Sequence, residues 1–302
     1  MNYTTLISAE ILHQHLNDPN WVIIDCRFSL ADTEIGFSAY RHGHIPNARY
    51  AHLGKDLSSN ITDFTGRHPL PNMKELVNKL GDWGIDNNSQ VVVYDDASGA
   101  FAGRLWWLLR YLGHNHVAVL DGGYKHWQKL GYPIITTLPA IKPRVFRAYP
   151  GENSALTALE IQNCLARKAI FLIDARTPER FRGEQEPIDP VAGHIPGAVN
   201  RPFQLNLDSN GLLLSAEALQ SQFKTLIGDK NPQQVVHMCG SGVTACHNLL
   251  AMEMSGLTGS KLYAGSWSEW IRDESRPTAR DGGGGSAAIG KELLRPIVTK
   301  CN

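Results

Sequence analysis

The stretch "VVHMCGSGVTACHNLL", Val235 to Leu250, joins three kinds of local sequence in one place. Its β-branched start is typical of a strand that is buried on both faces. From Thr244 to Ser255, apolar residues recur at the spacing of a helix face. A short loop, Cys239 to Val243, lies between the two. A strand that runs through a tight loop into a helix is the unit from which α/β domains are built.

The loop has the composition of an anion-binding turn. Gly240 and Gly242 lack a Cβ, so we expect the backbone to adopt φ > 0 there and to turn its N–H groups inward. Successive inward N–H groups bind anions, and the positive end of the following helix adds to the effect. A cysteine surrounded by such N–H groups is stabilised as the nucleophilic thiolate. We therefore expect Cys239 to be the nucleophile. The amides expected to hold its charge belong to Gly240, Ser241, Gly242, Val243 and Thr244.

This unit belongs to a module that occurs twice in the chain. The matching pairs are "VIIDCR", Val22 to Arg27, with "FLIDAR", Phe171 to Arg176; "GHIPNA", Gly43 to Ala48, with "GHIPGA", Gly193 to Ala198; and "VVVYD", Val91 to Asp95, with "VVHMC", Val235 to Cys239. A repeat of this length indicates a duplicated domain rather than a solenoid. In the first copy, Asp95 stands where the second copy has Cys239.

The 302-residue chain is long enough for two domains. Short β-branched runs such as "WVIID" alternate with helical segments such as "GRLWWLLRYLG", which predicts α/β domains with mostly parallel sheets flanked by helices. We place the first copy at 1–140, a linker at 141–155, the cysteine-bearing copy at 156–276 and a flexible tail with "GGGGS" at 277–302.

Composition narrows the function classes. Lys plus Arg and Asp plus Glu each number 29, so the formal net charge is zero and nothing favours a nucleic-acid or membrane-surface partner. No apolar run reaches the roughly 18 residues of a membrane span, and the N-terminus does not resemble a secretory signal. Five irregularly spaced cysteines without a CxxC pair favour reduced thiols and no structural zinc. We expect a cytoplasmic protein with no metal and no organic cofactor.

Two chemistries use a cysteine in a loop of this kind. Phosphate-ester hydrolysis uses a loop that ends in an arginine, but Ala245 stands at that position here. In sulfur transfer, the thiolate attacks a sulfur atom, the donor leaves and the cysteine keeps a persulfide. The short, uncharged loop leaves room for the extra sulfur, so sulfur transfer is favoured. A cysteine phosphatase and a non-catalytic sulfur-relay protein stay open as alternatives.

The repeated blocks and the "CGSGVTA" loop resemble the two-domain rhodanese sulfurtransferases, over nearly the whole chain up to about Arg276. The loop is similar to that of the 3-mercaptopyruvate sulfurtransferases, whereas thiosulfate-specific relatives often carry charged residues directly after the cysteine. The resemblance implies two rhodanese-like domains packed face to face, with the site in the cleft and only the C-terminal copy catalytic. The implied donor is 3-mercaptopyruvate, or alternatively thiosulfate, and the implied acceptor is cyanide, a thiol or thioredoxin.

The donor of this class is a small anion, which guanidinium groups bind well. By resemblance, we expect Arg180 to bind the donor and Arg182 to assist. We expect Arg176 to serve the strand end, as Arg27 does in the first copy. Mercaptopyruvate enzymes tend to have another arginine after the "EP" of this segment, where this chain has Ile188. That departure favours thiosulfate, so the donor is left open.

The resemblance also implies a group that moves a proton, made of a loop serine with a histidine and an aspartate from the other domain. The matching residues are Ser241, His68 in "GRHPLP", and Asp56, which lies close to the position of Gly54 where the acid is expected.

Other polar or reactive side chains have simpler interpretations. His44 and His194 occur in both copies, so we expect them to bond local backbone rather than to react. Cys246 has core spacing within its helix. We interpret Asp95–Asp96 as part of a solvated loop, and the aromatic residues of 106–111 as core or inter-domain packing.

Overall fold

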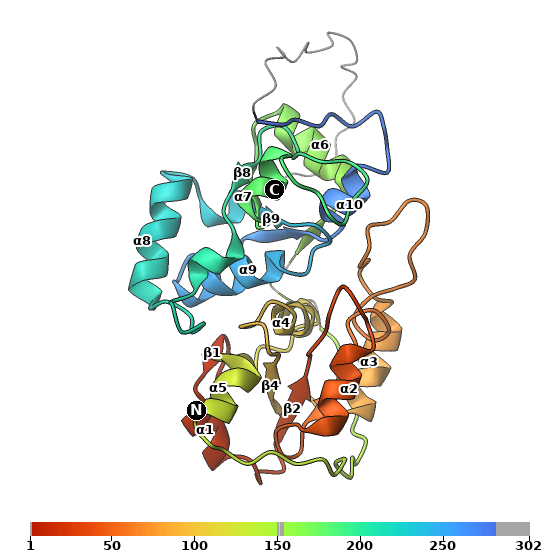
Figure 1. Ribbon diagram of the computed structural model, residues 1–302, viewed down its shortest axis with the longest axis vertical. Coiled ribbons are helices and arrows are strands. Elements are labelled where there is room, and N and C mark those ends of the chain that lie inside the picture. Colours follow the sequence, from red (N-terminus) through yellow and green to blue (C-terminus); the bar gives the residue numbers. More distant parts are fainter. Residues whose placement is uncertain (1, 150, 152–153, 282–302) are drawn as a thin grey trace.

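In the computed structural model, which describes residues 2–149, 151 and 154–281, the chain forms two α/β domains stacked on each other (Figure 1). The sheet of the first domain has five strands in the order β1-β5-β4-β2-β3, and that of the second has the order β6-β10-β9-β7-β8. The strand pairs in both sheets are parallel. The predicted pair of parallel α/β domains is confirmed, and the two copies share one topology.

Strands and helices alternate along both domains. The first contains β1 Leu6–Ile7, α1 Ala9–Gln14, β2 Trp21–Asp25, α2 Ile35–His42, β3 Arg49–Tyr50, α3 Met73–Asp82, β4 Gln90–Tyr94, α4 Ala102–Tyr111, β5 Val117–Leu120 and α5 Gly123–Lys129. The second contains β6 Ala155–Leu156, α6 Ala158–Ala166, β7 Phe171–Asp174, α7 Pro178–Arg182, β8 Val199–Asn200, the 3-10 helix η1 Phe203–Asn206, α8 Ala216–Ile227, η2 Pro232–Gln234, β9 Val235–Met238, α9 Ala245–Met254, β10 Lys261–Tyr263 and α10 Ser266–Trp270.

Both sheets are covered by apolar layers on their two faces. In β2, Val22 and Ile24 pack into one core, while Ile23 packs into the core on the opposite face. In the second domain, Leu172 and Ile173 likewise point to opposite cores. Successive side chains of a strand alternate in this way, which explains why continuous β-branched runs form these central strands.

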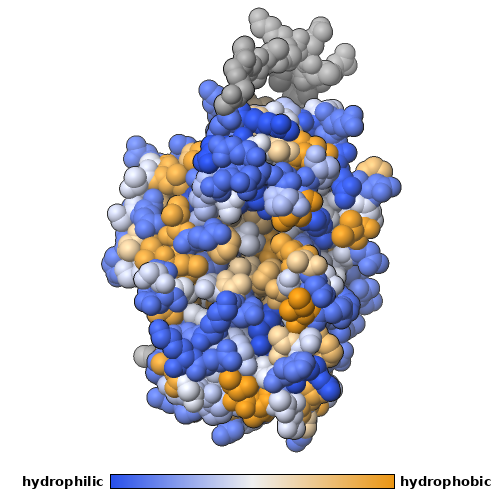
Figure 2. Space-filling view, viewed as in Figure 1, coloured by the Kyte–Doolittle hydropathy of each residue, from blue (hydrophilic) through white to orange (hydrophobic). Residues whose placement is uncertain are grey.

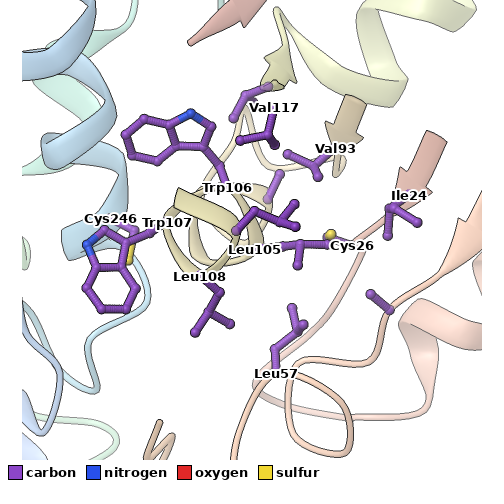
Figure 3. Packing of buried hydrophobic residues seen from close by; sticks show 14 of the residues in the cluster. Ile24, Cys26, Leu57, Val93, Leu105, Trp106, Trp107, Leu108, Val117 and Cys246 are labelled. Atoms are coloured by element: carbon purple, nitrogen blue, oxygen red, sulfur yellow. The ribbon is translucent and has the colours of Figure 1, made fainter. Parts of the chain in front are cut away.

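The domains meet through helices α4 and α9, which lie between the two sheets (Figure 1). A Cβ at Gly103 of α4 would lie only 3.4 Å from the backbone N of His247, so the glycine permits a close crossing. Trp107 of α4 lies beside Cys246 of α9 in a core that both domains share (Figure 3). Trp106 and Trp107 are fully buried, as the prediction of core or inter-domain packing requires. The shared core holds the cleft in a fixed geometry.

Segments outside the sheets also pack onto them. Within the predicted linker, the Phe146 side chain is buried, and the Arg144 backbone N–H donates to Gly81 O. This stretch therefore packs against the first domain. In the predicted tail, Ala279 pairs with His194, while residues 282–302 lie outside the described part of the chain. Hydrophobic residues gather near the level where the domains meet (Figure 2). In the described ranges, no helix has the length and apolarity to cross a bilayer.

Candidate active site

The loop between β9 and α9 holds the cysteine sulfur against a backbone donor. Gly242 has φ +74°, and a Cβ there would lie 2.2 Å from Ala264 O, so only glycine fits. Gly242 N–H donates to Cys239 Sγ at 3.2 Å. The cysteine backbone is fixed as well, because its N–H donates to Ser266 Oγ at 3.1 Å. The predicted turn at Gly242 is confirmed.

Gly240 has a different role from the predicted one. It is not among the described glycines with positive φ. A Cβ at this position would instead lie 2.8 Å from Arg67 Nη2 and 3.5 Å from both terminal nitrogens of Arg180. The expectation of φ > 0 is therefore wrong at Gly240. Glycine is favoured here because it lets two guanidinium groups approach the loop.

The equivalent loop of the first domain, which follows β4, encloses a carboxylate. Asp95, which stands in the place of Cys239, is fully buried. Its carboxylate accepts four backbone N–H groups, those of Ala97, Gly99, Phe101 and Ala102, at 2.7 to 2.9 Å. The interpretation of Asp95 as a solvated residue is wrong, because these amides of the following loop and of the first residue of α4 compensate for its burial. The corresponding loop at Cys239 also runs from a strand into a helix, and its Gly242 N–H donates to the cysteine sulfur.

Cys239 lies at the base of a pocket of about 120 Å³ between the domains. The residue is only 2% exposed, so we expect reactants to reach its thiol through this pocket. The lining residues are Leu30, Arg67 and Phe101 of the first domain and Ala175, Arg176, Thr177, Arg180, Phe203, Gln204, Cys239, Gly240, Ser241, Val243 and Thr244 of the second. The pocket beside Cys239 therefore lies between the two domains.

Arg176 has the structural role that its repeat predicts. Its Nη2 lies 2.7 Å from Asp174 Oδ2 and donates to the carbonyl of the glycine that begins "GHIPGA". Arg27 makes the same contacts in the first domain, with Asp25 Oδ2 at 2.6 Å and the glycine carbonyl of "GHIPNA". These pairs hold the ends of equivalent strands.

The two arginines predicted to bind the donor point in different directions. Arg180 lines the pocket, and its Nη2 lies 2.7 Å from Glu186 Oε1. Arg182 does not line it; its side chain is 38% exposed and its Nε lies 2.7 Å from Glu184 Oε1. The expectation that Arg182 assists donor binding is therefore corrected. Residues two apart on a helix point to different sides, so both cannot face the pocket.

Arg67 is a pocket residue that the sequence analysis does not identify. It precedes His68 in "GRHPLP", and its Nη1 donates to Asp189 Oδ1. Arg180 Nη2 reaches the other oxygen of the same carboxylate at 3.2 Å. Burial, with a contribution from the nearby charge of Arg180, lowers the pKa of Arg67. The only sequence signal was a cation beside the predicted histidine.

Ser241 and His68 meet across the domain interface. His68 Nδ1 lies 2.8 Å from Ser241 Oγ, within hydrogen-bond distance. Burial, together with the positive charges of Arg104 and Arg67, lowers the pKa of His68 to about 3. The imidazole is therefore neutral at pH 7 and can exchange a proton with the serine hydroxyl.

Asp56 does not join this pair. Its Oδ2 accepts the His52 N–H at 2.8 Å, and its Oδ1 lies 3.1 Å from Lys79 Nζ. The prediction that Asp56 assists His68 is therefore corrected, because local backbone and a lysine already use both carboxylate oxygens. The structure contains the predicted serine and histidine without the predicted aspartate.

Comparison with known proteins gives the family. The rhodanese-like domain matches twice, over residues 8–130 and 157–273. The chain belongs to the rhodanese family. A Pseudomonas aeruginosa protein named "Probable 3-mercaptopyruvate sulfurtransferase" is 45% identical over 281 residues, 92% of this chain and 99% of that protein. The thiosulfate sulfurtransferase of Rattus norvegicus is 32% identical over 281 residues, 89% of this chain and 93% of that protein.

Solved rhodanese structures superimpose on most of the chain. SseA from Escherichia coli, described as having the rhodanese fold of 3-mercaptopyruvate sulfotransferases, gives a TM-score of 0.76 at 28% identity. The match covers 88% of this chain and 100% of the SseA chain. This rhodanese-family protein is therefore a sulfurtransferase, as the sequence predicts.

In this rhodanese-family protein, Arg104 bonds both to the cysteine loop and to the segment that carries His68. It lies fully buried on α4. Its guanidinium donates to Gly242 O at 3.1 Å, to His68 O at 3.1 Å and to Pro69 O at 3.3 Å. One side chain of the first domain thus fixes the cysteine loop and the histidine segment together.

We expect Arg104→Met to lower the free energy of unfolding by about 2 kcal/mol or more, because buried carbonyls lose their donors. Sulfur-transfer kcat should fall as well, since the loop and His68 lose their common support. Urea denaturation and steady-state kinetics measure the two effects. Arg104→Lys keeps the charge but cannot bond all three carbonyls, so it should recover only part of the stability. A wild-type urea midpoint in Arg104→Met would contradict this role.

The remaining sequence predictions concern side chains outside the pocket. His44 Nδ1 lies 2.8 Å from Tyr40 O, and His194 Nδ1 lies 2.8 Å from Phe181 O. The predicted backbone-bonding role of both histidines is confirmed. Cys246 is fully buried in the shared core, also as predicted.

Proposed function

We propose that this protein transfers a sulfane sulfur from 3-mercaptopyruvate to a thiophilic acceptor through a persulfide on Cys239. One observation carries the proposal: the cysteine sulfur accepts a backbone N–H at the base of a pocket whose wall includes Arg180. A backbone donor stabilises a thiolate, and a guanidinium attracts an anionic donor. The catalytic unit is the second domain, proposed at 156–276, with the first domain supplying part of the wall.

In the first half-reaction, the Cys239 thiolate attacks the sulfur of the donor. An S–S bond forms and the donor's C–S bond breaks, with its electron pair moving to the carbon to give the enolate of pyruvate. The enolate takes one proton and leaves as pyruvate, while Cys239 keeps the sulfur as a persulfide. The amides of the loop, from Gly240 to Thr244, are proposed to hold the charge on the sulfur in both states.

The proton is proposed to come from Ser241. Its Oγ bonds the neutral imidazole of His68, so the pair can hand a proton to the enolate and be resupplied from solvent. Because burial keeps His68 neutral, the pair adds no fixed positive charge beside the sulfur. Asp56 has no part in the proposed step.

In the second half-reaction, an acceptor attacks the outer sulfur of the persulfide. Cyanide would leave as thiocyanate, and a thiol or thioredoxin would leave carrying the sulfur; either way Cys239 returns as the thiolate. Donor and acceptor use the same small pocket in turn, so kinetics should be ping-pong. A cytoplasmic location, where thiols stay reduced, suits a reaction that needs a free Cys239.

Thiosulfate is the second candidate donor. Ile188, at the position where mercaptopyruvate enzymes tend to carry an arginine, is 42% exposed and offers no charge. A curated relative of similar coverage is named for thiosulfate. Cysteine phosphatase chemistry is disfavoured, because buried Ala245 begins α9 at the position where the phosphate-binding arginine would stand.

The test is to treat the protein with each donor and measure two quantities. Mass spectrometry should find one added sulfur atom on Cys239, and thiocyanate formation should show a higher kcat/KM with 3-mercaptopyruvate. A higher kcat/KM with thiosulfate would overturn the choice of donor but not the reaction. A persulfide that neither cyanide nor a thiol removes would instead identify a sulfur-relay protein.

A further inference from the structure

A second pocket, of about 330 Å³, lies on the first domain and shares no lining residue with the pocket at Cys239. Its walls come from the segment between α1 and β2, from β3, from Gly84 after α3, and from residues 139–144, which lead into the predicted linker. The volume falls in the range of about 300–1,000 Å³ that is usual for small-molecule sites. The lining includes three cations, Arg49, Lys142 and Arg144.

Arg49 is a partly buried cation without an acidic partner. Its Nη1 donates to Asn47 O at 2.8 Å, but its Nε is buried and has no hydrogen-bond partner within the described residues. Its Nη2 likewise makes no hydrogen bond in the part of the chain that the structure describes. Burial, with a contribution from the nearby charge of Arg144, lowers the pKa of Arg49. A buried donor without an acceptor is costly, and a ligand oxygen would supply the missing acceptor.

The second domain shows that the fold does not need an arginine here. Arg49 of β3 pairs with Ile24 of β2, and Val199 of β8 pairs in the same way with Ile173 of β7. Val199 is therefore the equivalent of Arg49 in the other copy. An apolar residue completes the short edge strand there, so the strand itself gives no reason for the cation.

The other two cations come from the segment that leads out of the first domain. Arg144 is held in place, because its Nη1 lies 3.2 Å from Asp86 Oδ2 and its Nη2 donates to Pro19 O at 2.8 Å. Lys142 is exposed and forms no ion pair within the described ranges. The acidic residue of the lining is Asp18, whose Oδ1 accepts the N–H of Asn20 at 2.9 Å.

The pocket therefore has an excess of positive charge. Arg49 and Lys142 have no acidic partner among the described residues, and the guanidinium of Arg49 keeps two neighbouring nitrogens, Nε and Nη2, without an acceptor. Two adjacent N–H groups match two oxygens of a carboxylate or a phosphate. A phosphate group, with a charge of about −1.5 to −2 near pH 7, also balances two cations. Trp21 lines the same pocket and offers an apolar wall to a larger ligand.

We propose that this pocket binds a phosphate group, either as the free ion or as part of a small phosphorylated molecule. Arg49 is the main contact, Lys142 closes over the anion from the exposed side, and Arg144 adds its charge. The site does not depend on the proposed sulfur-transfer reaction, because it lies in the first domain and includes no residue of the Cys239 pocket.

The test is isothermal titration calorimetry with inorganic phosphate at low ionic strength. We expect one saturable site in the wild-type protein with a Kd of about 1 mM or below. Arg49→Val, which installs the residue found at the equivalent position 199, should weaken binding at least about tenfold. Phenyl phosphate should bind the same site. A lower Kd for phenyl phosphate than for phosphate would identify a phosphorylated molecule as the ligand, and a lower Kd for phosphate would identify the free ion.

Three further variants make the assignment specific. Lys142→Met, at an exposed position, should weaken binding about threefold and serves as the test if Arg49→Val folds poorly. Arg167→Met removes an exposed arginine of the second domain and should leave the Kd unchanged. Arg180→Met should also retain the site, because Arg180 lines the other pocket.

The proposal is overturned if phosphate shows no saturation at about 10 mM, or if Arg49→Val and Lys142→Met both bind within about twofold of wild type. It is also overturned if binding is lost in Arg180→Met and kept in Arg49→Val, since the ion would then occupy the pocket at Cys239. Mass spectrometry separates this result from the proposed function: Arg49→Val should gain one sulfur on Cys239 to the same extent as wild type, which also shows that the variant is folded.

Discussion

Replacing Cys239 with serine should abolish sulfur transfer and leave the fold intact. A serine hydroxyl is not ionised near neutral pH and is a poor nucleophile toward sulfur, so we expect kcat to fall by at least about 10⁴-fold. The hydroxyl is close in size to the thiol and can accept the same Gly242 N–H. The free energy of unfolding should therefore change by less than about 1 kcal/mol. Thiocyanate formation and thermal unfolding measure the two quantities.

Cys246→Ser is the control for this substitution. Cys246 lies fully buried on α9, and its Sγ donates to Gly242 O at 3.4 Å. Burial raises the pKa of this thiol to about 12, so it stays protonated and unreactive. The variant should still gain one sulfur atom on Cys239, with some loss of stability from the buried hydroxyl. Turnover that survives in Cys239→Ser, or an added sulfur found on Cys246, would refute the assignment of the nucleophile.

The fold could be predicted because its signals are local and occur twice. Continuous β-branched runs such as Trp21–Asp25 form central strands in both sheets, and each is followed by the same strand-end arginine. The tight turn at Gly242 follows from chemistry within a few residues of Cys239. Sequence reasoning is reliable where the cause of a structure lies close along the chain.

The features that were missed depend on residues far apart in the sequence. Arg67 matters because Asp189 of the other domain holds it over Gly240, and neither position alone indicates the contact. The sequence predicts Asp95 in a solvated loop, but four backbone N–H groups that follow it donate to its buried carboxylate. Asp56 fails as a partner of His68 because nearby groups already occupy its carboxylate.

Stability should fall steeply as the pH is lowered from 7.5 to 5, because four buried histidines are held neutral. Burial lowers the pKa of His68 and His237 to about 3, and that of His114 and His247 to about 4. In the unfolded chain each has an ordinary pKa of about 6.5. Below that value the unfolded state binds protons that the folded state does not, so acid favours unfolding.

The size of the effect follows from the same linkage. The contribution of each histidine is fully present above pH 6.5 and is lost as the pH falls from 6.5 toward the folded pKa of about 3 or 4. At pH 5 the loss is about 2 kcal/mol for each group. Burial raises the carboxyl pKa values of Asp25 and Asp121, which acts in the opposite direction. We therefore expect a net loss of several kcal/mol, a large share of the roughly 5–15 kcal/mol of a typical domain.

Thermal and urea denaturation at pH 7.5, 6 and 5 would measure this loss, with Tm expected to fall by about 10 °C or more. His114→Gln isolates the contribution of one histidine to this loss, because His114 is 2% exposed and lies away from the pocket. The variant should reduce the slope of stability against pH by about 1 kcal/mol per pH unit between pH 6 and 5. His42→Gln, at an exposed histidine, should leave the slope unchanged. Equal stability at pH 7.5 and 5, or a wild-type slope in His114→Gln, would show that these imidazoles gain protons in the folded state.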